Sequence, residues 1–549
     1  MTGQTQVSAT PDSPLDVIIV GAGVGGLYSI YKLRELGFKV HALEQASGVG
    51  GTWFYNRYPG CRCDVESYQY SYSFSEELQR EWTWTERFAP QPEILAYLNH
   101  VADRFNLRKD ITFNTTVLSA VWNEDQRLWT VNCADGTKWT AHYCLMATGP
   151  LSVPRTSVLP KQEQFKGEVY YTGTWPEGGV DVKGKRVAVV GTSASGTQCV
   201  PILAAEADHL TVFQRTPNFS VPSRNAPMDP KVDADWKANY TDLRKKQWNT
   251  RSAIIFQDPV QPALETSDEE LERIFEERWA SGGLGFMRAF TDLFTDQRAN
   301  DLAADFVRRK IAETVKDPEL AKKLLPWGHP IGARRLCTDP GFYDAFNRDN
   351  VDLVDVKADP IVEVYDKGIR TESGATYEFD VLVLATGFQA MMGALMKMDI
   401  VGTGGRLLRD QWANGPEAHL GLAITGFPNL FYQVGPLSTG SLASMIQGNE
   451  VQTDWLADLL VHARKQHIDR IESTPEKDHA WMEECERAAS AFVHYTAKES
   501  SYIMIGADGS RRFLVYMGGF DTYQKKLKEC VDHGYEGFVL QHERETEKA

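Results

Sequence analysis

Short apolar runs alternate with helical stretches over the first fifty residues of the chain. The run LDVIIV, residues 15–20, is rich in β-branched residues, which is typical of a buried parallel strand. The segment that follows has helical spacing and ends at Gly37, and KVHALE, residues 39–44, predicts a second strand. The pattern therefore predicts a strand–helix–strand unit whose first turn is GAGVGG, residues 21–26.

The glycines of this turn have the spacing of a dinucleotide-binding loop. Gly21 makes the turn, Gly23 lets the backbone approach a pyrophosphate, and Gly26 lets the helix pack on the strand. The helix N-terminus then stabilises the phosphate charge. Glu44, at the end of the second strand, is expected to accept hydrogen bonds from ribose hydroxyls. The unit predicts a site for FAD or NAD.

A second unit of the same kind spans residues 185–215, with strands predicted over 185–190 and 210–215. Its turn is formed by Gly191, Thr192, Ser193, Ala194, Ser195 and Gly196. Ser193 replaces the middle glycine, so we expect a slightly less close approach to the pyrophosphate. Arg215 stands where the first unit has Glu44, and an arginine can pair with a 2′-phosphate that an acid would repel. We therefore predict an NADP site that includes Thr216, although Arg215 as a solvated surface charge is the alternative.

Two ATG segments, at residues 144–150 and 381–388, predict strands that end in small-residue turns where the chain crosses between nucleotide domains. We expect an α/β fold with two Rossmann-like dinucleotide-binding domains. The predicted FAD domain comprises residues 1–150 and 386–549, the NADP domain comprises 151–227 and 331–385, and the charged segment 228–330 is a helical insertion. The insertion either covers the active site or is a solvated subdomain.

Composition narrows the class of protein. The net charge is −16, from 58 basic and 74 acidic residues, which argues against a general nucleic-acid binder. Eight cysteines without regular spacing predict reduced thiols in the cytoplasm. No apolar run reaches the roughly 18 residues of a membrane span. We expect a cytoplasmic monomer that binds small molecules and not membranes.

The segment GGTWFYNRYPGCRCD, residues 50–64, resembles the motif of type I Baeyer–Villiger monooxygenases. The matching positions are Gly50, Gly51, Trp53, Tyr58, Pro59, Gly60 and Asp64. A second family motif, F-x-G-x-x-x-H-x-x-x-W-P, is similar to FKGEVYYTGTWP, residues 165–176, except that Tyr171 stands at the histidine position. The segment GARRLCTDPGFYDAFNRDNV, residues 332–351, is similar to the family's catalytic-arginine segment, and the resemblance covers nearly the whole chain.

This resemblance implies the cofactors, the reaction and the substrates. In the family NADPH reduces FAD, O2 then forms a C4a-peroxyflavin, and the peroxide converts a ketone to an ester or lactone. The expected cofactors are FAD and NADP, and the expected substrates are O2 and a small-molecule ketone that the sequence does not identify. A paired cysteine beside the flavin, as a disulfide reductase needs, is not suggested by the C-x-C spacing of Cys61 and Cys63.

The resemblance also implies residue roles. Arg335 is the expected catalytic cation, oriented by Asp64, and Arg334 is the expected second contact to the 2′-phosphate. An ordinary interdomain ion pair is the alternative for Arg335 and Asp64. The flavin is expected to contact Gly51, Thr52, Trp53, Asp64 and Tyr70. Met445 and Ile446 occupy the family's pocket positions within residues 435–447, and simple core packing is the alternative for them.

Two departures and two further rivals stay open. Tyr171 replaces a histidine associated with domain movement, and Ser500 replaces a tryptophan in a loop that closes over NADP. These positions put coupling and rate in doubt rather than the reaction class. A flavin monooxygenase that oxidises nitrogen or sulfur shares both nucleotide folds. A module that binds FAD and NADP without turnover is the rival from outside enzymes.

Overall fold

The computed structural model describes residues 14–156, 158–259, 261–439, 443–497, 500 and 502–542. Strand β1 (Leu15–Val20), helix α1 (Val24–Glu35) and strand β2 (Val40–Leu43) form the first unit. Strand β1 pairs in parallel with β2 on one side and with β6 (Lys138–Met146) on the other, which explains its continuous apolar run. The predicted unit is confirmed, with Glu44 as the first residue after β2 rather than its last.

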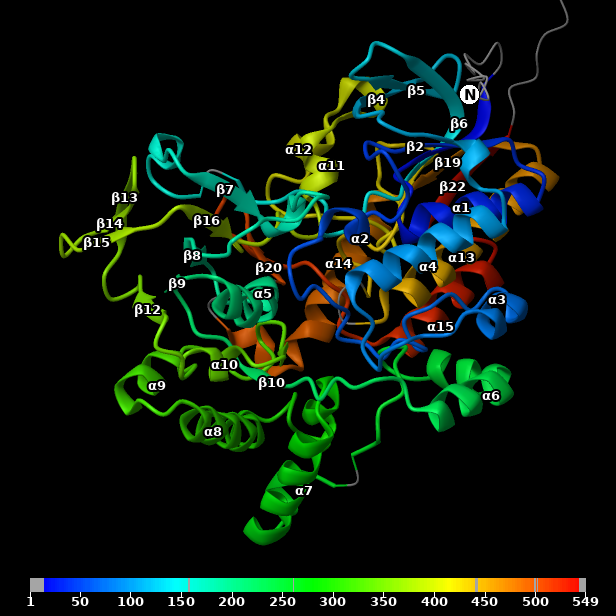
Figure 1. Cartoon of the computed structure of the whole chain (residues 1–549). Coiled ribbons are helices and arrows are strands. Elements are labelled where there is room, and N and C mark those ends of the chain that lie inside the picture. Colours follow the sequence, from blue (N-terminus) through cyan, green and yellow to red (C-terminus); the bar gives the residue numbers. More distant parts are fainter. Residues whose placement is uncertain are drawn as a thin grey trace, which may run out of the picture.

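The first sheet has the strand order β17-β4-β5-β6-β1-β2-β3, and β18 pairs with β6. Its other strands are β3 (Ile111–Thr112), β4 (Val117–Asn123), β5 (Leu128–Cys133), β17 (Asp399–Val401) and β18 (Leu430–Tyr432). Helix α1 packs against the long helix α13 (Met445–Lys465), where the Tyr28 hydroxyl donates to Asp454 over 2.8 Å. Segments from the first and last parts of the described chain therefore build one layer beside the sheet (Figure 1).

The second sheet has the order β12-β9-β8-β16-β7, and every pairing in it is parallel. The strands are β7 (Glu168–Tyr171), β8 (Arg186–Val190), β9 (His209–Gln214), β12 (Val351–Asp355) and β16 (Val381–Leu384). Helix α5 (Ala194–Glu206) joins β8 to β9, as predicted, but β9 ends at Gln214 and Arg215 follows it. A β-meander of β13 (Ile361–Tyr365), β14 (Gly368–Thr371) and β15 (Thr376–Glu378) precedes β16.

A helical region separates β9 from β12 in the sequence. It comprises α6 (Pro230–Trp248), α7 (Asp268–Ser281), α8 (Gln297–Thr314) and α9 (Pro318–Leu324). Figure 1 shows these green helices below both sheets, with α6 near the first-sheet half and α8 and α9 near the second. The two-stranded pair β10 (Ser220–Pro222) and β11 (Cys337–Asp339) brackets the region. The α/β class with two dinucleotide folds is confirmed, and the domain boundaries stay a prediction.

Smaller elements complete the chain. They are α2 (Thr52–Tyr55), α3 (Glu76–Glu81), α4 (Gln91–Arg104), α10 (Phe342–Ala345), α11 (Gly393–Lys397), α12 (Leu408–Gln411), α14 (Pro475–Ser490), α15 (Phe520–Asp532), β19 (Ile468–Ser473), β20 (Ile503–Ile505), β21 (Arg511–Phe513) and β22 (Phe538–His542). Within the described residues, none of the helices combines the length and the apolar character that crossing a bilayer requires.

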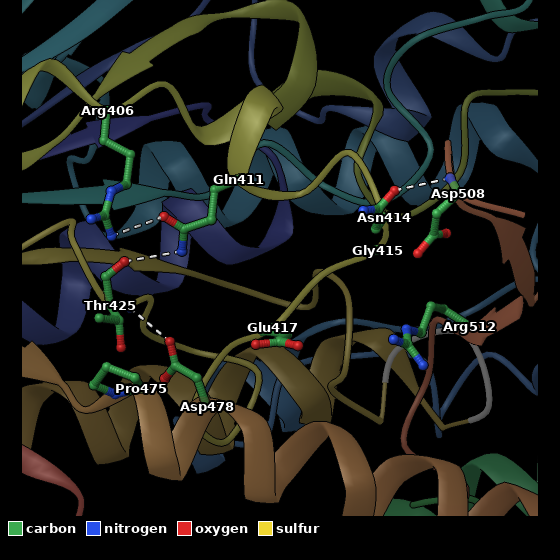
Figure 2. A pocket seen from close by; sticks show the side chains of 10 residues that line it. All are labelled: Arg406, Gln411, Asn414, Gly415, Glu417, Thr425, Pro475, Asp478, Asp508 and Arg512. Carbon is green, nitrogen blue, oxygen red and sulfur yellow. Dashed lines mark hydrogen bonds between the residues drawn. The ribbon is translucent and has the colours of Figure 1, made fainter. Parts of the chain in front are cut away.

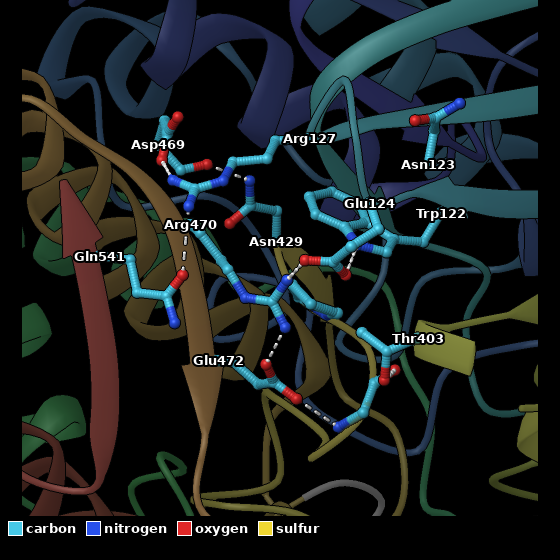
Figure 3. A network of polar contacts seen from close by, with 12 residues as sticks. Trp122, Asn123, Glu124, Arg127, Thr403, Asn429, Asp469, Arg470, Glu472 and Gln541 are labelled. Carbon is cyan, nitrogen blue, oxygen red and sulfur yellow. Dashed lines mark hydrogen bonds and ion pairs between the residues drawn. The ribbon is translucent and has the colours of Figure 1, made fainter. Parts of the chain in front are cut away.

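A buried polar network ties the C-terminal strands to the first sheet (Figure 3). Arg470 on β19 is 9% exposed, pairs with Glu124 beyond β4, and donates to Glu472 over 2.7 Å. Glu472 in turn accepts from the Gly426 backbone N–H over 2.7 Å, and Glu124 accepts from the Trp122 indole over 2.9 Å. The cation therefore joins segments that are far apart in the sequence, and its removal leaves two acids facing each other.

We predict that Arg470→Met destabilises the protein. Breaking a buried ion pair costs about 3 kcal/mol because the partner carboxylates stay desolvated without their cation. The thermal unfolding midpoint of the FAD-loaded protein measures the effect. Arg487→Met is the control, because Arg487 is 72% exposed, pairs with Glu484 on one helix, and contributes well under about 1 kcal/mol. Equal midpoints for the two variants would show that the network carries no stability.

Candidate active site

The first glycine turn packs so tightly that side chains would fill it. Gly21 has φ +108°, and a Cβ on it would stand 2.6 Å from the carbonyl oxygen of Ala147. A Cβ on Gly26 would stand 2.0 Å from the Gly21 carbonyl oxygen, and one on Gly23 would stand 3.3 Å from the Gly51 Cα. Backbone therefore comes close on each side of the turn, as a cradle for a pyrophosphate requires. The first ATG segment supplies one of these walls through Ala147.

Glu44 is fixed directly behind this turn. Its carboxylate accepts from the backbone N–H of Ala22 over 2.7 Å and of Ala46 over 2.8 Å, and the residue is 4% exposed. Burial raises the pKa of Glu44, and these backbone hydrogen bonds oppose that shift. A carboxylate has about four acceptor sites, so the two backbone bonds are compatible with the predicted bonds to a ribose.

The second glycine turn repeats the geometry of the first. Gly191 has φ +110°, and a Cβ on it would stand 2.4 Å from the Ala385 carbonyl oxygen. A Cβ on Gly196 would stand 2.1 Å from the Gly191 carbonyl oxygen. Ala385 belongs to the second ATG segment, so both ATG segments press their alanine carbonyl against the first glycine of a turn. Thr192, in the same turn, donates to Gln214 at the end of β9 over 3.3 Å.

A bidentate ion pair joins Arg335 to Asp64, across the two halves of the molecule. The guanidinium donates to both carboxylate oxygens, from Nε over 2.9 Å and from Nη2 over 2.8 and 2.7 Å. The side chains of Arg335 and Asp64 are 37% and 20% exposed, so the pair keeps some access to solvent. The charge of Asp64 raises the pKa of Arg335 further above its usual range, which keeps the guanidinium protonated.

An aromatic pair lies close to this ion pair. The Trp53 indole donates to the Tyr70 hydroxyl over 3.1 Å, with ring centroids 5.7 Å apart, and both residues are buried. Burial raises the pKa of Tyr70, and its electrostatic neighbours include Asp64 and Arg335. Thr52 begins the short helix α2 that carries Trp53. The residues predicted to contact the flavin therefore gather around one place.

Ser500 lies beside the ion pair as well. Its hydroxyl donates to the carbonyl oxygen of Ala333 over 2.8 Å, two residues before Arg335. Residues 498, 499 and 501 next to it lie outside the described residues. The serine that stands at the family's tryptophan position thus contacts the backbone that positions Arg334 and Arg335.

The motif segment, residues 50–64, has a second role that no local pattern predicts. The Tyr58 hydroxyl donates to the Gln198 side-chain oxygen on α5 over 2.8 Å, and Gln198 donates to the Arg62 carbonyl over 3.1 Å. Gly60 has φ +82°, and a Cβ on it would stand 2.5 Å from the Gln198 carbonyl oxygen. The segment therefore packs against the helix that follows the second glycine turn, although Gln198 is far away in the sequence.

The other predicted positions occupy defined places. Arg215 is exposed, Thr216 beside it is half-buried, and Arg334 is half-buried next to Arg335. Met445 and Ile446 begin helix α13, with Ile446 1% exposed and residues 440–442 before them outside the described residues. The remaining turn residues, Ser193, Ala194 and Ser195, are the N-cap and first two positions of α5.

Two positions of the second family motif lie near the edge of the second sheet. Tyr171 ends β7, where its hydroxyl accepts from Gln162 over 2.6 Å. The Trp175 backbone N–H donates to the Tyr55 carbonyl over 3.2 Å, and Trp175 is buried. Trp175 thus links the edge of the second sheet to the helix that carries Trp53.

The cysteines of the motif segment are thiols in a dry environment. Cys61 and Cys63 are free and buried, and burial raises the pKa of Cys61 to about 12. A thiol with that pKa holds its proton at neutral pH and is a poor nucleophile. Among the described residues, the histidine, cysteine and acidic side chains form no group that could hold a metal ion.

A separate polar pocket of about 600 Å³ lies between α12, α14 and the β20–β21 hairpin (Figure 2). It is lined by Arg406, Gln411, Asn414, Gly415, Glu417, Thr425, Pro475, Asp478, Asp508 and Arg512. Arginines and acids face the same space, so the lining does not favour a ligand of one charge. None of these residues belongs to the ion pair or to either glycine turn.

Comparison with known proteins identifies the family. A family model described as pyridine nucleotide-disulphide oxidoreductase matches residues 18–274. A Baeyer–Villiger monooxygenase from Pseudooceanicola batsensis is 40% identical over 98% of this chain and 98% of its own. A phenazine N-monooxygenase from Lysobacter antibioticus is 39% identical over 96% of this chain and 97% of its own. The structure of an oxidised steroid monooxygenase bound to NADP matches with a TM-score of 0.92 and 46% identity, over 97% of this chain and 100% of that one.

These similarities span nearly the whole chain at identities well above those at which a fold alone is shared. The chain belongs to the type I Baeyer–Villiger monooxygenase family. It is an FAD-containing, NADPH-dependent monooxygenase, as the two glycine turns and the sequence resemblance indicated.

We predict that Glu44→Gln weakens FAD binding by about 10-fold or more. Each hydrogen bond to a charged group contributes about 1.5–3 kcal/mol, and the amide keeps the shape of the side chain while removing its charge. Release of FAD, followed by flavin fluorescence on dilution, measures the affinity. Glu35→Gln, at an exposed position on α1, is the control. Unchanged affinity in Glu44→Gln would remove the ribose from this position.

A second prediction concerns the choice of coenzyme. If Arg215 and Arg334 both meet the 2′-phosphate, NADPH should reduce the flavin far better than NADH. Loss of either arginine should narrow that preference by roughly 10- to 100-fold. Stopped-flow reduction under anaerobic conditions compares the two coenzymes, with Arg298→Ala, 78% exposed on α8, as the control. Equal reduction rates with NADPH and NADH in the unaltered protein would contradict the assignment.

Proposed function

We propose that this protein catalyses the Baeyer–Villiger oxidation of a small-molecule ketone to an ester or lactone, with NADPH and O2 as co-substrates. The observation that carries the proposal is the bidentate ion pair of Arg335 and Asp64, which lies among the residues expected to contact the flavin. A monomeric state and a cytoplasmic location stay predictions of the sequence.

The residues present fit both cofactors. Each glycine turn leaves a cradle that a single Cβ would fill, and each opens the N-terminus of a helix, which favours a pyrophosphate. For FAD we assign Gly21, Gly23, Gly26, Glu44, Gly51, Thr52, Trp53, Asp64 and Tyr70. For NADP we assign residues 191–196 with Arg215, Thr216 and Arg334. When bound, FAD supplies the redox chemistry, taking hydride from NADPH and delivering one oxygen atom of O2 to the substrate while the other leaves as water.

Arg335 acts as a fixed positive charge. Addition of an oxygen nucleophile to a ketone places negative charge on the former carbonyl oxygen, and the adduct then rearranges to the ester. A preorganised cation stabilises that charge without reorganisation at the moment of reaction. Because Asp64 raises the pKa of Arg335, the guanidinium does not exchange its proton in the working pH range, and its role is electrostatic rather than acid–base.

Asp64 acts as a positioning residue. It accepts from the Nε and Nη2 edge of the guanidinium, which fixes the plane and direction of the whole planar group. A lone arginine on a half-exposed surface has several rotatable bonds and would sample many positions. The carboxylate therefore converts a flexible charge into a directed one.

Met445 and Ile446 are our proposed substrate contacts. They begin helix α13, and the half-buried Met445 offers a flexible apolar side chain. Apolar contacts discriminate weakly between substrates that differ by one methylene, so we expect tolerance of several ketones.

Oxidation of a nitrogen atom is the second candidate, because the phenazine N-monooxygenase relative is nearly as similar as the Baeyer–Villiger relative. Oxygen transfer to nitrogen or sulfur uses the lone pair of that atom and creates no alkoxide on carbon. The requirement for a fixed cation therefore differs between the two reactions, and Arg335 separates them.

We predict that Arg335→Ala lowers ester formation by about 100-fold or more, the usual scale for removing a preorganised donor. The variant should fold and bind FAD, because the side chain is partly exposed and little core is lost. NADPH consumption should continue, with the oxygen released as hydrogen peroxide. Asp64→Ala should give a milder version of the same loss. Ester per NADPH and peroxide per NADPH, measured over a ketone panel, check both variants.

The contrary outcomes are distinct. Ester formation at the unaltered rate in Arg335→Ala would reject the proposed mechanism. Oxidation of amines or sulfides that survives in Arg335→Ala, with no ester from any ketone in the unaltered protein, would favour the second candidate.

A further inference from the structure

The segment that connects α9 to β11 lies on both sides of Arg215. We call residues 323–330 the strap. At one end of it, Gln214 donates from its side-chain nitrogen to the Lys323 carbonyl over 2.8 Å. At the other end, the His329 Nε2 lies 3.3 Å from the Pro217 carbonyl oxygen. The strap is therefore held to the residues just before and just after Arg215 and Thr216.

Trp327, in the middle of the strap, is unusually exposed. The chain has 14 tryptophans, all of them in the described residues, and Trp327 is the one that is exposed, at 66%. The other tryptophans are buried or half-buried. Leaving a large aromatic side chain in water forgoes a favourable burial energy, so an exposed tryptophan on a fixed segment calls for a partner.

Arg308 on α8 holds one face of Trp327. Its guanidinium carbon lies 4.2 Å from the centroid of the indole, and its Nε donates to the Pro326 carbonyl over 2.8 Å. Arg308 also pairs with Asp305 over 2.6 Å, and its side chain is 12% exposed. The cation is thus fixed on the protein side of the ring, and the exposure of Trp327 comes from its remaining surface.

Positive charge surrounds this platform although the whole chain carries a net charge of −16. Lys323 belongs to the strap, and Arg215 lies between the strap's two contacts. Burial lowers the pKa of the His329 ring, and Arg334 and Arg308 both lie near enough to lower it further. The strap therefore joins the two arginines assigned to the 2′-phosphate with the arginine that backs Trp327.

We infer that Trp327, backed by Arg308, is the stacking platform for the adenine base of NADP. This inference rests on the proposed placement of the 2′-phosphate at Arg215 and Arg334. The base and the 2′-phosphate are attached to neighbouring carbons of one ribose, so an aromatic face beside the phosphate site is where the base must come. Stacking on tryptophan is favourable for a purine, and the cation behind the indole adds to the attraction.

The alternative role for Trp327 is to shield the apolar stem of Arg308 from water. Shielding would make Trp327 matter for the stability of the strap and not for any ligand. The two roles differ in what a base-free ligand does, which makes them separable by experiment.

The test measures binding to the oxidised, FAD-loaded enzyme by titration calorimetry, without turnover. The probes are NADP+, adenosine 2′,5′-bisphosphate, and ribose 2,5-bisphosphate, which lacks the base. We expect Trp327→Ala to weaken binding of the first two by about 10-fold and to leave ribose 2,5-bisphosphate unchanged. Trp327→Phe, which keeps an aromatic face, should stay within about threefold of the unaltered protein. Leu302→Ala, an exposed apolar position on α8, is the matched control.

Three results decide between the roles. If Trp327→Ala binds adenosine 2′,5′-bisphosphate as the unaltered protein does, or weakens both bisphosphates equally, the stacking role is wrong. If Trp327→Phe loses as much affinity as Trp327→Ala, the aromatic face is not the reason. If Arg215→Ala also leaves adenosine 2′,5′-bisphosphate binding unchanged, the proposed NADP placement itself fails, whereas a loss there with no effect at Trp327 rejects the platform alone.

Discussion

One bidentate ion pair connects the two halves of this enzyme at the place where their chemistry must meet. Asp64 ends the motif segment of the first half, and Arg335 lies just before β11, from which the chain returns to the second. A guanidinium held through two edges has one plane and one direction, whereas a free side chain has many. The electrostatic role proposed for Arg335 depends on that direction. The nearby Trp53–Tyr70 pair and the Ser500 contact to Ala333 approach the pair from other segments.

The two halves are built by the same construction. In each, a parallel strand ends at a glycine whose positive φ and close carbonyl neighbour exclude a side chain. The carbonyl comes from the alanine of an ATG segment in both cases, which gives a physical reason for the recurrence of that tripeptide. The motif segment then adds a contact between halves through Tyr58, Gly60 and Gln198. The ion pair is thus placed by two similar scaffolds that meet along a defined interface.

Local chemistry decides which of these features a sequence can predict. The apolar runs predicted β1, β8 and β9 to within a residue at either end, because a buried parallel strand has to be apolar throughout. The glycine spacing predicted both turns for the same reason of local fit. Roles for Arg335 and Asp64 came from resemblance to a family, since nothing in the spacing of residues so far apart implies their contact. The Gln198 contact and the strap around Arg215 were not predicted, because both depend on how distant segments pack.

Whether Asp64 works by directing Arg335 is tested most directly by a double-mutant cycle on ester formation. Arg335→Ala, Asp64→Ala and the double variant are compared with the unaltered enzyme at saturating NADPH and ketone, with FAD content checked in each. If the carboxylate acts through the arginine, removing it from a protein that already lacks Arg335 should change the ester rate by less than about threefold. If the two losses multiply instead, Asp64 acts independently of Arg335, and the positioning role proposed for it is contradicted.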